Sequence, residues 1–323
     1  MSKIIRAAEV FADEIKDIEQ GERRRRMAEA GRKKLVTPED YRDALHDRIR
    51  LGDEVTGFPM PWEKTHDKFR FPKQTVSLLA GMSGHMKSTT LSQIAIHLCK
   101  DTKVGIMSLE MPIVEQLFTM AQQFVARDEP KERDADRMVE FLNGSIWFYD
   151  STEVADAEKV YSAICAMHER GIEFVILDNL QMFVGRMDND AETAFIKEVR
   201  QMAIAFDMAI VLVHHVRKPP EGLEERIPTK HSVRGSGGLT DIAHHTLIVF
   251  HNKARAEALR DQEAGRMLTD RQQQLLSEQA DYTIHVAKNR SGKFEGKFYL
   301  YSGNGRTLKE YADSADCRLM APS

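Results

Sequence analysis

Several features that would place this chain in a specialised class are scarce or missing. The 323 residues include only three cysteines, scattered and odd in number, so the sequence predicts neither a disulfide framework nor a cysteine metal site. It contains no apolar run of about 18 residues, the length that spans a membrane. Residues 1–30 also lack the apolar segment of a signal peptide. We therefore expect a cytoplasmic protein with no membrane segment.

An excess of basic charge is absent as well. The chain has 46 Lys and Arg against 50 Asp and Glu, a net charge of −4, so an overall basic surface cannot explain nucleic-acid binding. Binding of nucleic acid would therefore require a local basic patch. The 42% hydrophobic content is that of an ordinary globular protein with an ample core.

From about Trp62 onward, short apolar runs alternate with amphipathic stretches. This alternation predicts an α/β fold in which a mostly parallel, twisted sheet carries helices on both faces. The expected strands are Val76–Ala80, Val104–Leu109, Ile146–Tyr149, Phe174–Leu177, Ala209–Val213 and Thr246–His251. The expected helices are Thr89–Lys100, Val114–Arg127, Asp156–Arg170 and Glu192–Phe206. Residues 253–280 are very polar and predict one protruding helix, followed by a C-terminal β-hairpin of Tyr282–Lys288 and Lys297–Tyr301.

The chain also divides by composition. Residues 1–60 are charge-dense and predict a helical arm and linker, residues 61–310 the main domain, and residues 311–323 a tail. Thr37 and Pro38 indicate the start of a helix that runs to about Leu51. The run Arg23–Arg26 invites a nucleic-acid interpretation, but a solvated helix face is favoured.

The segment Leu78–Thr90, LLAGMSGHMKSTT, joins an apolar strand to a glycine-rich turn and a helix, the context of a phosphate-binding P-loop. Main-chain N–H groups and the helix N-terminus would surround the phosphates of ATP or another NTP. Lys87 would reach the terminal phosphates, and the Ser88 hydroxyl would hold Mg²⁺. The predicted nucleotide-binding residues are Gly81, Ser83, Gly84, His85, Met86, Lys87, Ser88 and Thr89.

One position departs from the P-loop consensus, which has glycine where this chain has Met86. Methionine keeps its main-chain N–H, so phosphate binding depends on the backbone conformation. We expect a near-helical backbone at Met86, with the unbranched side chain turned away from the nucleotide.

Two acidic residues end apolar strands. Asp178, in EFVILDNLQ, is predicted to hold Mg²⁺ together with Ser88, although a strand-ending Asp can also cap a helix. Glu110, in VGIMSLEMP, would face Lys87 and could activate the attacking water. Its position alone leaves the alternative of a surface glutamate equally open.

A third strand, in IVLVHHVRKP, ends at His215 and leads into a long loop, Val216–Leu239. His215 could sense the γ-phosphate; a lone histidine would be read as a satisfied, partly buried one, but its place beside a basic loop favours the sensor. Glycines allow close approach to a phosphodiester and cations neutralise it. The predicted DNA-binding residues are Arg217, Lys218, Lys230, Arg234, Gly235, Ser236 and Gly237.

In this order the motifs resemble those of the ring-shaped RecA-type replicative DNA helicases: the DnaB type, the helicase half of phage primase-helicases, and Twinkle. The similar segments are SLEMP at Ser108–Pro112, VILDNLQ at Val175–Gln181, HHVRKP at His214–Pro219, SVRGSGGLTDIAHHT at Ser232–Thr246 and AKNRSGKFEG at Ala287–Gly296. The resemblance covers roughly residues 70–305.

The resemblance implies an ATP-driven helicase that translocates 5′→3′ on single-stranded DNA and unwinds a replication fork. It makes Glu110 the catalytic base and His215 the γ-phosphate sensor, with Lys288 and Arg290 completing the site of a neighbouring subunit. It therefore implies a homo-oligomer, expected to be a hexamer, in which residues 1–60 serve assembly. A primase or a helicase loader is a candidate partner. No primase module is evident, and a stand-alone phage or plasmid helicase, in the host-cell cytoplasm if phage-encoded, is the expectation.

Two other functions remain open. A RecA-like ATPase in recombination or helicase loading would keep the fold without unwinding DNA. A nucleotide-binding scaffold with a damaged P-loop would bind nucleotide without hydrolysis.

Overall fold

The computed structural model describes residues 35–52, 54–150, 156–179, 189–217, 226–233 and 237–316. The chain divides into two compact units, Met1–Glu54 and Val55–Ser323. No helix in these described ranges is long and apolar enough to cross a membrane.

The first unit contains the helix expected after Thr37. A short 3₁₀ helix, η1 (Pro38–Tyr41), leads into α2 (Arg42–Leu51). The Thr37 N–H and hydroxyl both donate to Asp40 Oδ2, at 2.7 and 2.9 Å, and so fix the start of the helix. The part of the predicted helical arm before Leu35, which includes the run Arg23–Arg26, lies outside the described residues.

The second unit is built on a nine-stranded sheet with the order β3-β2-β4-β5-β1-β6-β7-β8-β9. The first six strands in this order are mutually parallel, and β7, β8 and β9 are antiparallel to their neighbours. The strands are β1 (Thr75–Gly81), β2 (Val104–Ser108), β3 (Ile146–Phe148), β4 (Phe174–Asp178), β5 (Ala209–His215), β6 (His245–His251), β7 (Tyr282–Asn289), β8 (Gly296–Ser302) and β9 (Leu308–Lys309). The predicted fold class and hairpin are confirmed.

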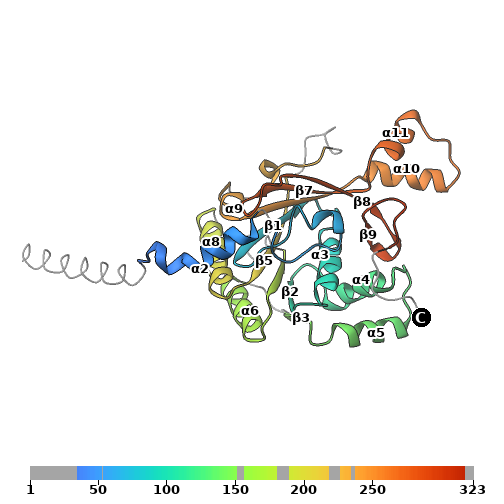
Figure 1. Ribbon diagram of the computed structural model, residues 1–323. Helices are drawn as coiled ribbons and strands as arrows, with labels where there is room; N and C mark the ends of the chain where they lie inside the picture. Colours follow the sequence, from blue (N-terminus) through green and yellow to red (C-terminus); the bar gives the residue numbers. More distant parts are fainter. Residues whose placement is uncertain are drawn as a thin grey trace, which may run out of the picture. The chain divides into compact units, whose positions relative to one another are not determined.

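Helices cover both faces of this sheet (Figure 1). On one face α3 (Lys87–Leu98), α4 (Ile113–Val125) and α5 (Glu132–Leu142) share a core with Leu79 and Ile176. On the other face α6 (Ala157–Glu169), α8 (Asn189–Ala205) and α9 (Gly237–Ile242) share a core with Leu78 and Leu177. Neighbouring strand residues thus point into different cores, as the two-residue period of a strand requires.

Two helical features differ from the prediction. Helix α5 was not expected, because its sequence is charge-dense and only Asp134, Met138 and Leu142 are buried. Residues 253–280 form two helices, α10 (Lys253–Glu263) and α11 (Asp270–Glu278), rather than one. Gly265, with φ +69°, lies between them, and the pair projects beyond the sheet (Figure 1). Short 3₁₀ helices complete the unit: η2 (Glu63–Thr65), η3 (Lys230–Ser232) and η4 (Asn304–Arg306).

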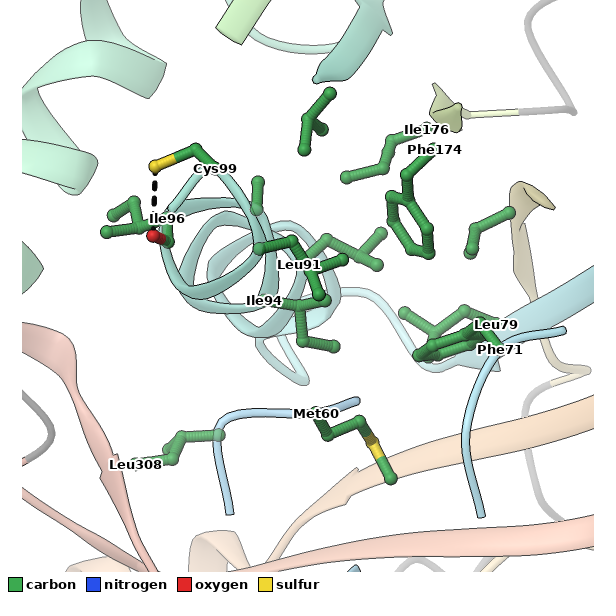
Figure 2. Packing of buried hydrophobic residues seen from close by; sticks show 14 of the residues in the cluster. Met60, Phe71, Leu79, Leu91, Ile94, Ile96, Cys99, Phe174, Ile176 and Leu308 are labelled. Atoms are coloured by element: carbon green, nitrogen blue, oxygen red, sulfur yellow. Dashed lines mark hydrogen bonds between the residues drawn. The ribbon is translucent and has the colours of Figure 1, made fainter. Parts of the chain in front are cut away.

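Apolar packing holds α3 against the sheet. Figure 2 shows Leu91 and Ile94 of this helix among Leu79, Phe71 and Met60. Each fully buried side chain of this kind contributes about 1.5–3 kcal/mol. Met60 is the last of the residues 1–60 that we predicted to be a helical arm and linker, yet it is fully buried in the second unit. The helix that follows the P-loop is therefore packed both against β1 and against the segment that contains Met60.

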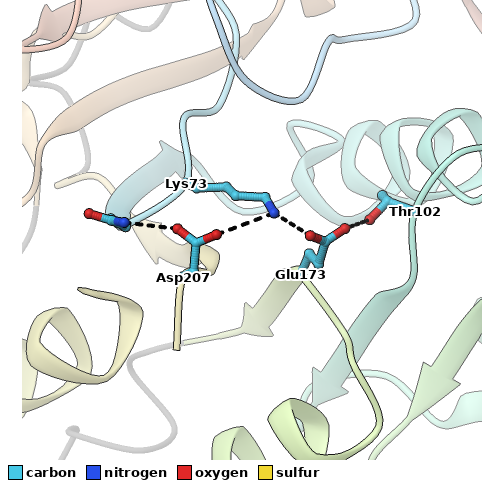
Figure 3. A network of polar contacts seen from close by, with 5 residues as sticks. Lys73, Thr102, Glu173 and Asp207 are labelled. Carbon is cyan, nitrogen blue, oxygen red and sulfur yellow. Dashed lines mark hydrogen bonds and ion pairs between the residues drawn. The ribbon is translucent and has the colours of Figure 1, made fainter. Parts of the chain in front are cut away.

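A polar network joins the amino ends of four parallel strands (Figure 3). Lys73 pairs with Glu173, and its Nζ lies 3.4 Å from Asp207 Oδ2. Thr102 donates to Glu173 at 2.8 Å, and Gln74 donates to Asp207 at 2.9 Å. These residues immediately precede β1, β2, β4 and β5, so the network aligns the strands whose opposite ends carry the predicted motifs.

Candidate functional site

The P-loop connects β1 to α3 through Met82–Met86 and is confined where it leaves the sheet. A Cβ added to Gly81 would lie 2.6 Å from the carbonyl oxygen of Val249, so only glycine fits there. Gly84 has φ +74°, a conformation that glycine adopts without strain. The loop is closed by the His85 N–H, which donates to the Met82 carbonyl at 3.2 Å.

The expectation of a near-helical backbone at Met86 is wrong. Its φ of 64° and ψ of 26° are left-handed, the conformation for which glycine is favoured. The handedness must change here because the next residue begins α3, and the Met86 carbonyl already accepts the Thr90 N–H at 2.8 Å. A side chain in this conformation costs roughly 1–2 kcal/mol. The left-handed backbone explains why the P-loop consensus has glycine at this position. In this chain methionine adopts that conformation.

Lys87 is buried and bonded within its own loop. Its Nζ donates to the carbonyls of Gly81 at 3.2 Å and Met82 at 3.1 Å. His215 Nδ1 lies 3.4 Å from the same Nζ. Burial lowers the pKa of the Lys87 ammonium, whereas Asp178 and Glu110 act in the opposite direction.

Asp178, at the end of β4, forms the second part of the site. The Ser88 hydroxyl donates to its Oδ2 at 2.5 Å, and its buried Oδ1 has no hydrogen-bond partner among the described residues. Burial raises the pKa of Asp178 to about 6; Ser88 and Lys87 oppose this rise and Glu110 adds to it. A hydroxyl beside a buried carboxylate with an unused oxygen fits Mg²⁺, which prefers oxygen ligands.

Glu110 and His215 meet through a residue to which the sequence assigned no role. Asn179 Nδ2 donates to Glu110 Oε2 at 3.0 Å, and it lies 2.9 Å from His215 Nε2. Glu110 follows β2 and His215 ends β5, while Asn179 follows β4, which lies between these strands in the sheet. The carboxyl ends of parallel strands thus bring the three side chains together.

Two of the other predicted nucleotide-binding residues have groups engaged elsewhere in the fold. His85 is buried, and its Nδ1 accepts the His251 N–H at 3.0 Å. Burial lowers the pKa of His85 to about 4, with Lys253 as the next contribution. The Thr89 carbonyl accepts from Gln123 at 2.9 Å.

The predicted DNA-binding residues are described in part. Arg217 follows β5 and is exposed, and its N–H donates to the Ser232 carbonyl at 2.7 Å. This bond and the bridge between Val216 and Val233 bring Lys230, which is also exposed, close to Arg217. Gly237 begins α9. Lys218, Arg234, Gly235 and Ser236 lie outside the described residues.

Lys288 and Arg290 do not join the P-loop of their own chain. Lys288 donates to the carbonyls of Thr240, of Asp241 at 3.1 Å and of Ala243 at 2.8 Å. Arg290 Nη2 donates to the Asp241 carbonyl at 2.7 Å. Burial, with Arg290 as the next contribution, lowers the pKa of Lys288 to about 8.

Strand register explains this separation. Lys288 faces Thr246, which faces Leu78 in the middle of β1, whereas the P-loop begins after Gly81. The Arg290 N–H donates to the His244 carbonyl at 3.1 Å, before β6 begins. Arg290 is therefore displaced toward the amino edge of the sheet, away from its own Lys87.

The chain matches the model of the AAA domain family over residues 53–221, which is more than half of its 323 residues. The chain belongs to this family. A search of curated proteins finds no match to this AAA domain protein. Solved structures do resemble it, and two of them are relevant to the motifs above.

One is the ATPase domain of another protein, with a TM-score of 0.67 and 17% identity over 86% of this chain and 99% of that one. The other is a DnaB-like replicative helicase, in a structure that also concerns its interactions with primase. That match has a TM-score of 0.64 and 16% identity over 85% of this chain and 67% of that chain. At these identities the likeness establishes the fold. The resemblance to replicative helicases is therefore confirmed, and this AAA domain has the helicase-type ATPase fold.

Sequence reasoning missed Asn179, although it lies inside the quoted motif EFVILDNLQ. The available signal was its position directly after Asp178, at the end of a buried strand. The sequence did not show its partners, Glu110 and His215, which lie at the ends of two other strands of the AAA domain.

Proposed function

We propose that this chain is an ATP-dependent, ring-shaped replicative DNA helicase that translocates on single-stranded DNA, 5′→3′, and unwinds duplex at a fork. The observation that carries the proposal is the gathering of five polar side chains at the carboxyl edge of one sheet. These are Lys87, Ser88, Glu110, Asp178 and His215. Ser88 donates to Asp178, Asn179 lies between Glu110 and His215, and Lys87 Nζ lies 3.4 Å from His215 Nδ1. A P-loop lysine (Lys87) beside a candidate base (Glu110) and a candidate metal-binding carboxylate (Asp178) supports ATP hydrolysis.

In the proposed reaction, main-chain N–H groups of the loop and of the first turn of α3 bind the phosphates. Lys87 exchanges its bonds to the Gly81 and Met82 carbonyls for the terminal phosphates. Glu110 orients the attacking water and accepts its proton, while His215 contacts the γ-phosphate. Mg²⁺ would be held by Ser88 and Asp178, where it would neutralise charge on the phosphate oxygens.

Completion of the site by a neighbour is part of the proposal. Lys288 and Arg290 lie too far toward the amino edge to serve their own P-loop, which supports a role at the P-loop of another subunit. An arginine supplied in trans stabilises the charge of phosphoryl transfer. Residues 1–60 would then serve assembly into a homo-oligomer, expected to be a hexamer. Within the first unit, Leu45 and Ile49 are 56% and 66% exposed, one helical turn apart on α2.

DNA would contact the loops that follow β5. Arg217 and Lys230 are brought close together by the Arg217–Ser232 bond, and both are exposed. Contacts of this kind neutralise phosphates without reading sequence. Replacing Arg217 and Lys218 together should weaken binding to all single-stranded sequences about equally and flatten the salt dependence of binding. An affinity that does not change with salt would contradict DNA binding through these loops.

The experiment that tests the proposal measures ATP hydrolysis, with and without single-stranded DNA, and strand displacement on forked duplexes. A 5′-tailed fork and a 3′-tailed fork distinguish the direction. We expect DNA-stimulated hydrolysis and displacement of the 5′-tailed fork only. Hydrolysis without displacement on either fork would favour the RecA-like ATPase of recombination or loading.

A second candidate function, the scaffold that binds nucleotide without hydrolysing it, is favoured by one observation, the strained Met86. Because Met86 retains its N–H, we expect Met86→Gly to change nucleotide affinity by less than about tenfold, or about 1.4 kcal/mol. Nucleotide binding that appears only in Met86→Gly would favour the scaffold instead.

A further inference from the structure

Asn179 occupies a position that joins the two groups proposed to act on the γ-phosphate. It is 3% exposed, and its amide nitrogen reaches both Glu110 Oε2, at 3.0 Å, and His215 Nε2, at 2.9 Å. An amide NH₂ group has two N–H donors, one for each neighbour. The opposite orientation of the amide would place its oxygen against the Glu110 carboxylate, where two acceptors would repel. The nitrogen therefore faces both residues.

This orientation determines which ring nitrogen of His215 carries the proton. Because Asn179 donates to Nε2, that atom must be an acceptor. A neutral imidazole has one acceptor and one donor, so the proton is on Nδ1. Nδ1 is the atom that lies 3.4 Å from the Lys87 ammonium. Two donors thus converge at the position where an anionic oxygen can accept from both.

We propose that Asn179 is a positioning residue, which holds His215 as its Nδ1–H tautomer and couples it to Glu110. The role rests on the proposed function, because it acts on the groups assigned to hydrolysis there. When a phosphate oxygen binds Lys87 and the Nδ1–H of His215, movement of the ring is transmitted through one amide to the Glu110 carboxylate. The water-activating group then responds to the presence of the phosphate it must attack.

The residue type is suited to this role. Aspartate at this position has the same shape but no N–H, so it would accept a hydrogen bond from a protonated His215 Nε2 and repel Glu110. Serine offers one donor and a shorter reach. Asparagine supplies two donors from a single atom, which the distances of 3.0 and 2.9 Å require.

The first test reads the tautomer directly and needs no activity. Imidazole ¹⁵N spectra of the full chain with ring-labelled histidine are recorded without nucleotide, and the signal missing in His215→Gln identifies His215. We expect a protonated Nδ1 in the wild type and a protonated Nε2 in Asn179→Asp, which preserves the shape of the residue. A protonated Nε2 in the wild type, or the same tautomer in both proteins, would overturn the proposal.

The second test asks whether Asn179 acts through His215. In a double-mutant cycle, Asn179→Ala should lower kcat at least about tenfold in the wild-type background and less than about threefold in His215→Ala. The KM for ATP should change less than about threefold in Asn179→Ala, because the phosphate-binding loop is untouched. Equal losses of kcat in both backgrounds would show independent roles and refute the coupling. A wild type without hydrolysis would refute the proposed function, while the spectra would still decide the tautomer.

Discussion

At the amino edge of the sheet, Lys73 lies between Glu173 and Asp207, and each carboxylate has a further hydrogen bond. At the carboxyl edge, Asp178 uses one oxygen for Ser88, and its other oxygen has no partner in the described part of the chain. The amino-edge groups are also more exposed: the side chain of Glu173 is 42% exposed, whereas Asp178 as a residue is 2% exposed. The acidic groups at the amino edge are thus paired and partly exposed, whereas Asp178 at the carboxyl edge is buried and has one oxygen without a partner among the described residues.

The difference shows where this fold is complete and where it is prepared for a ligand. The paired groups at the amino edge stabilise the folded chain as it stands. The carboxyl edge combines a buried carboxylate with the left-handed Met86, and both features cost free energy without a ligand. Replacements at the two edges should therefore have separable effects on activity and stability.

The largest effect is expected for Lys87→Ala. Removing the cation from the P-loop should lower ATP hydrolysis at least about a hundredfold, because positioned charge carries several kcal/mol in phosphoryl transfer. Lys73→Ala makes the same replacement at the amino edge and serves as the matched control. Asp178→Ala should have a similar effect to Lys87→Ala. Near-normal turnover in either carboxyl-edge variant would remove the distinction between the edges.

Arg290→Ala tests whether a residue at the amino edge of the sheet takes part in ATP hydrolysis at the P-loop of a neighbouring subunit. We expect nucleotide binding to persist while DNA-stimulated turnover falls about a hundredfold or more, as for other arginine fingers. Mixing Arg290→Ala with Lys87→Ala subunits should restore part of the turnover, since some junctions then contain an intact P-loop and an intact arginine. Undiminished hydrolysis in Arg290→Ala alone would contradict the role.

Asp178→Asn should stabilise the nucleotide-free protein at neutral pH. Asp178 has its pKa raised to about 6 in the folded chain, against about 3.9 when unfolded, so its contribution to stability falls as pH rises from about 4 to 6. The asparagine variant lacks this loss. Its free energy of unfolding should exceed that of the wild type by up to about 3 kcal/mol at pH 8, with little difference near pH 4. Urea unfolding at both pH values measures this, and a less stable variant at pH 8 would show that Asp178 is satisfied without ligand.

The smallest effect belongs to the amino edge. Lys73→Ala should lower the free energy of unfolding by about 1 kcal/mol, because its ion pairs are partly exposed, and leave hydrolysis within about twofold of the wild type. The loss should shrink at high salt, which screens exposed pairs. Lys100→Ala, an exposed lysine just before β2 and outside the network, is the matched control. A large loss of hydrolysis in Lys73→Ala would mean that the two edges are coupled.

Much of this architecture follows from local sequence patterns. The apolar runs predicted all six parallel strands, because strands buried on both faces contain almost no polar residues. Ser88 and Asp178 could be paired in advance because the P-loop and the strand-ending acid each have a local signature. Thr269 and Gln272 form a capping box that could have revealed the start of α11, since the Thr-x-x-Gln spacing is visible in the sequence.

Other features depend on geometry that no local pattern contains. The left-handed backbone of Met86 arises where the loop must turn into α3. Because residues other than glycine rarely adopt this conformation, the residue type alone predicted a near-helical backbone. Asn179 acquires its two partners only when β2, β4 and β5 align in one sheet. Lys288 and Arg290 were assigned by resemblance, and the register of β6 and β7 then separated them from their own P-loop.

The last strand of the sheet has a further consequence. The Leu308 N–H donates to Gln93 Oε1 at 2.8 Å, and its carbonyl accepts from Gln93 Nε2 at 3.0 Å and from Trp62 Nε1 at 2.8 Å. A helix side chain thus takes the hydrogen bonds that another β-strand would use. Exposed edge strands recruit strands from other molecules and lead to aggregation. At this end, the sheet is therefore closed to the addition of a strand from another molecule.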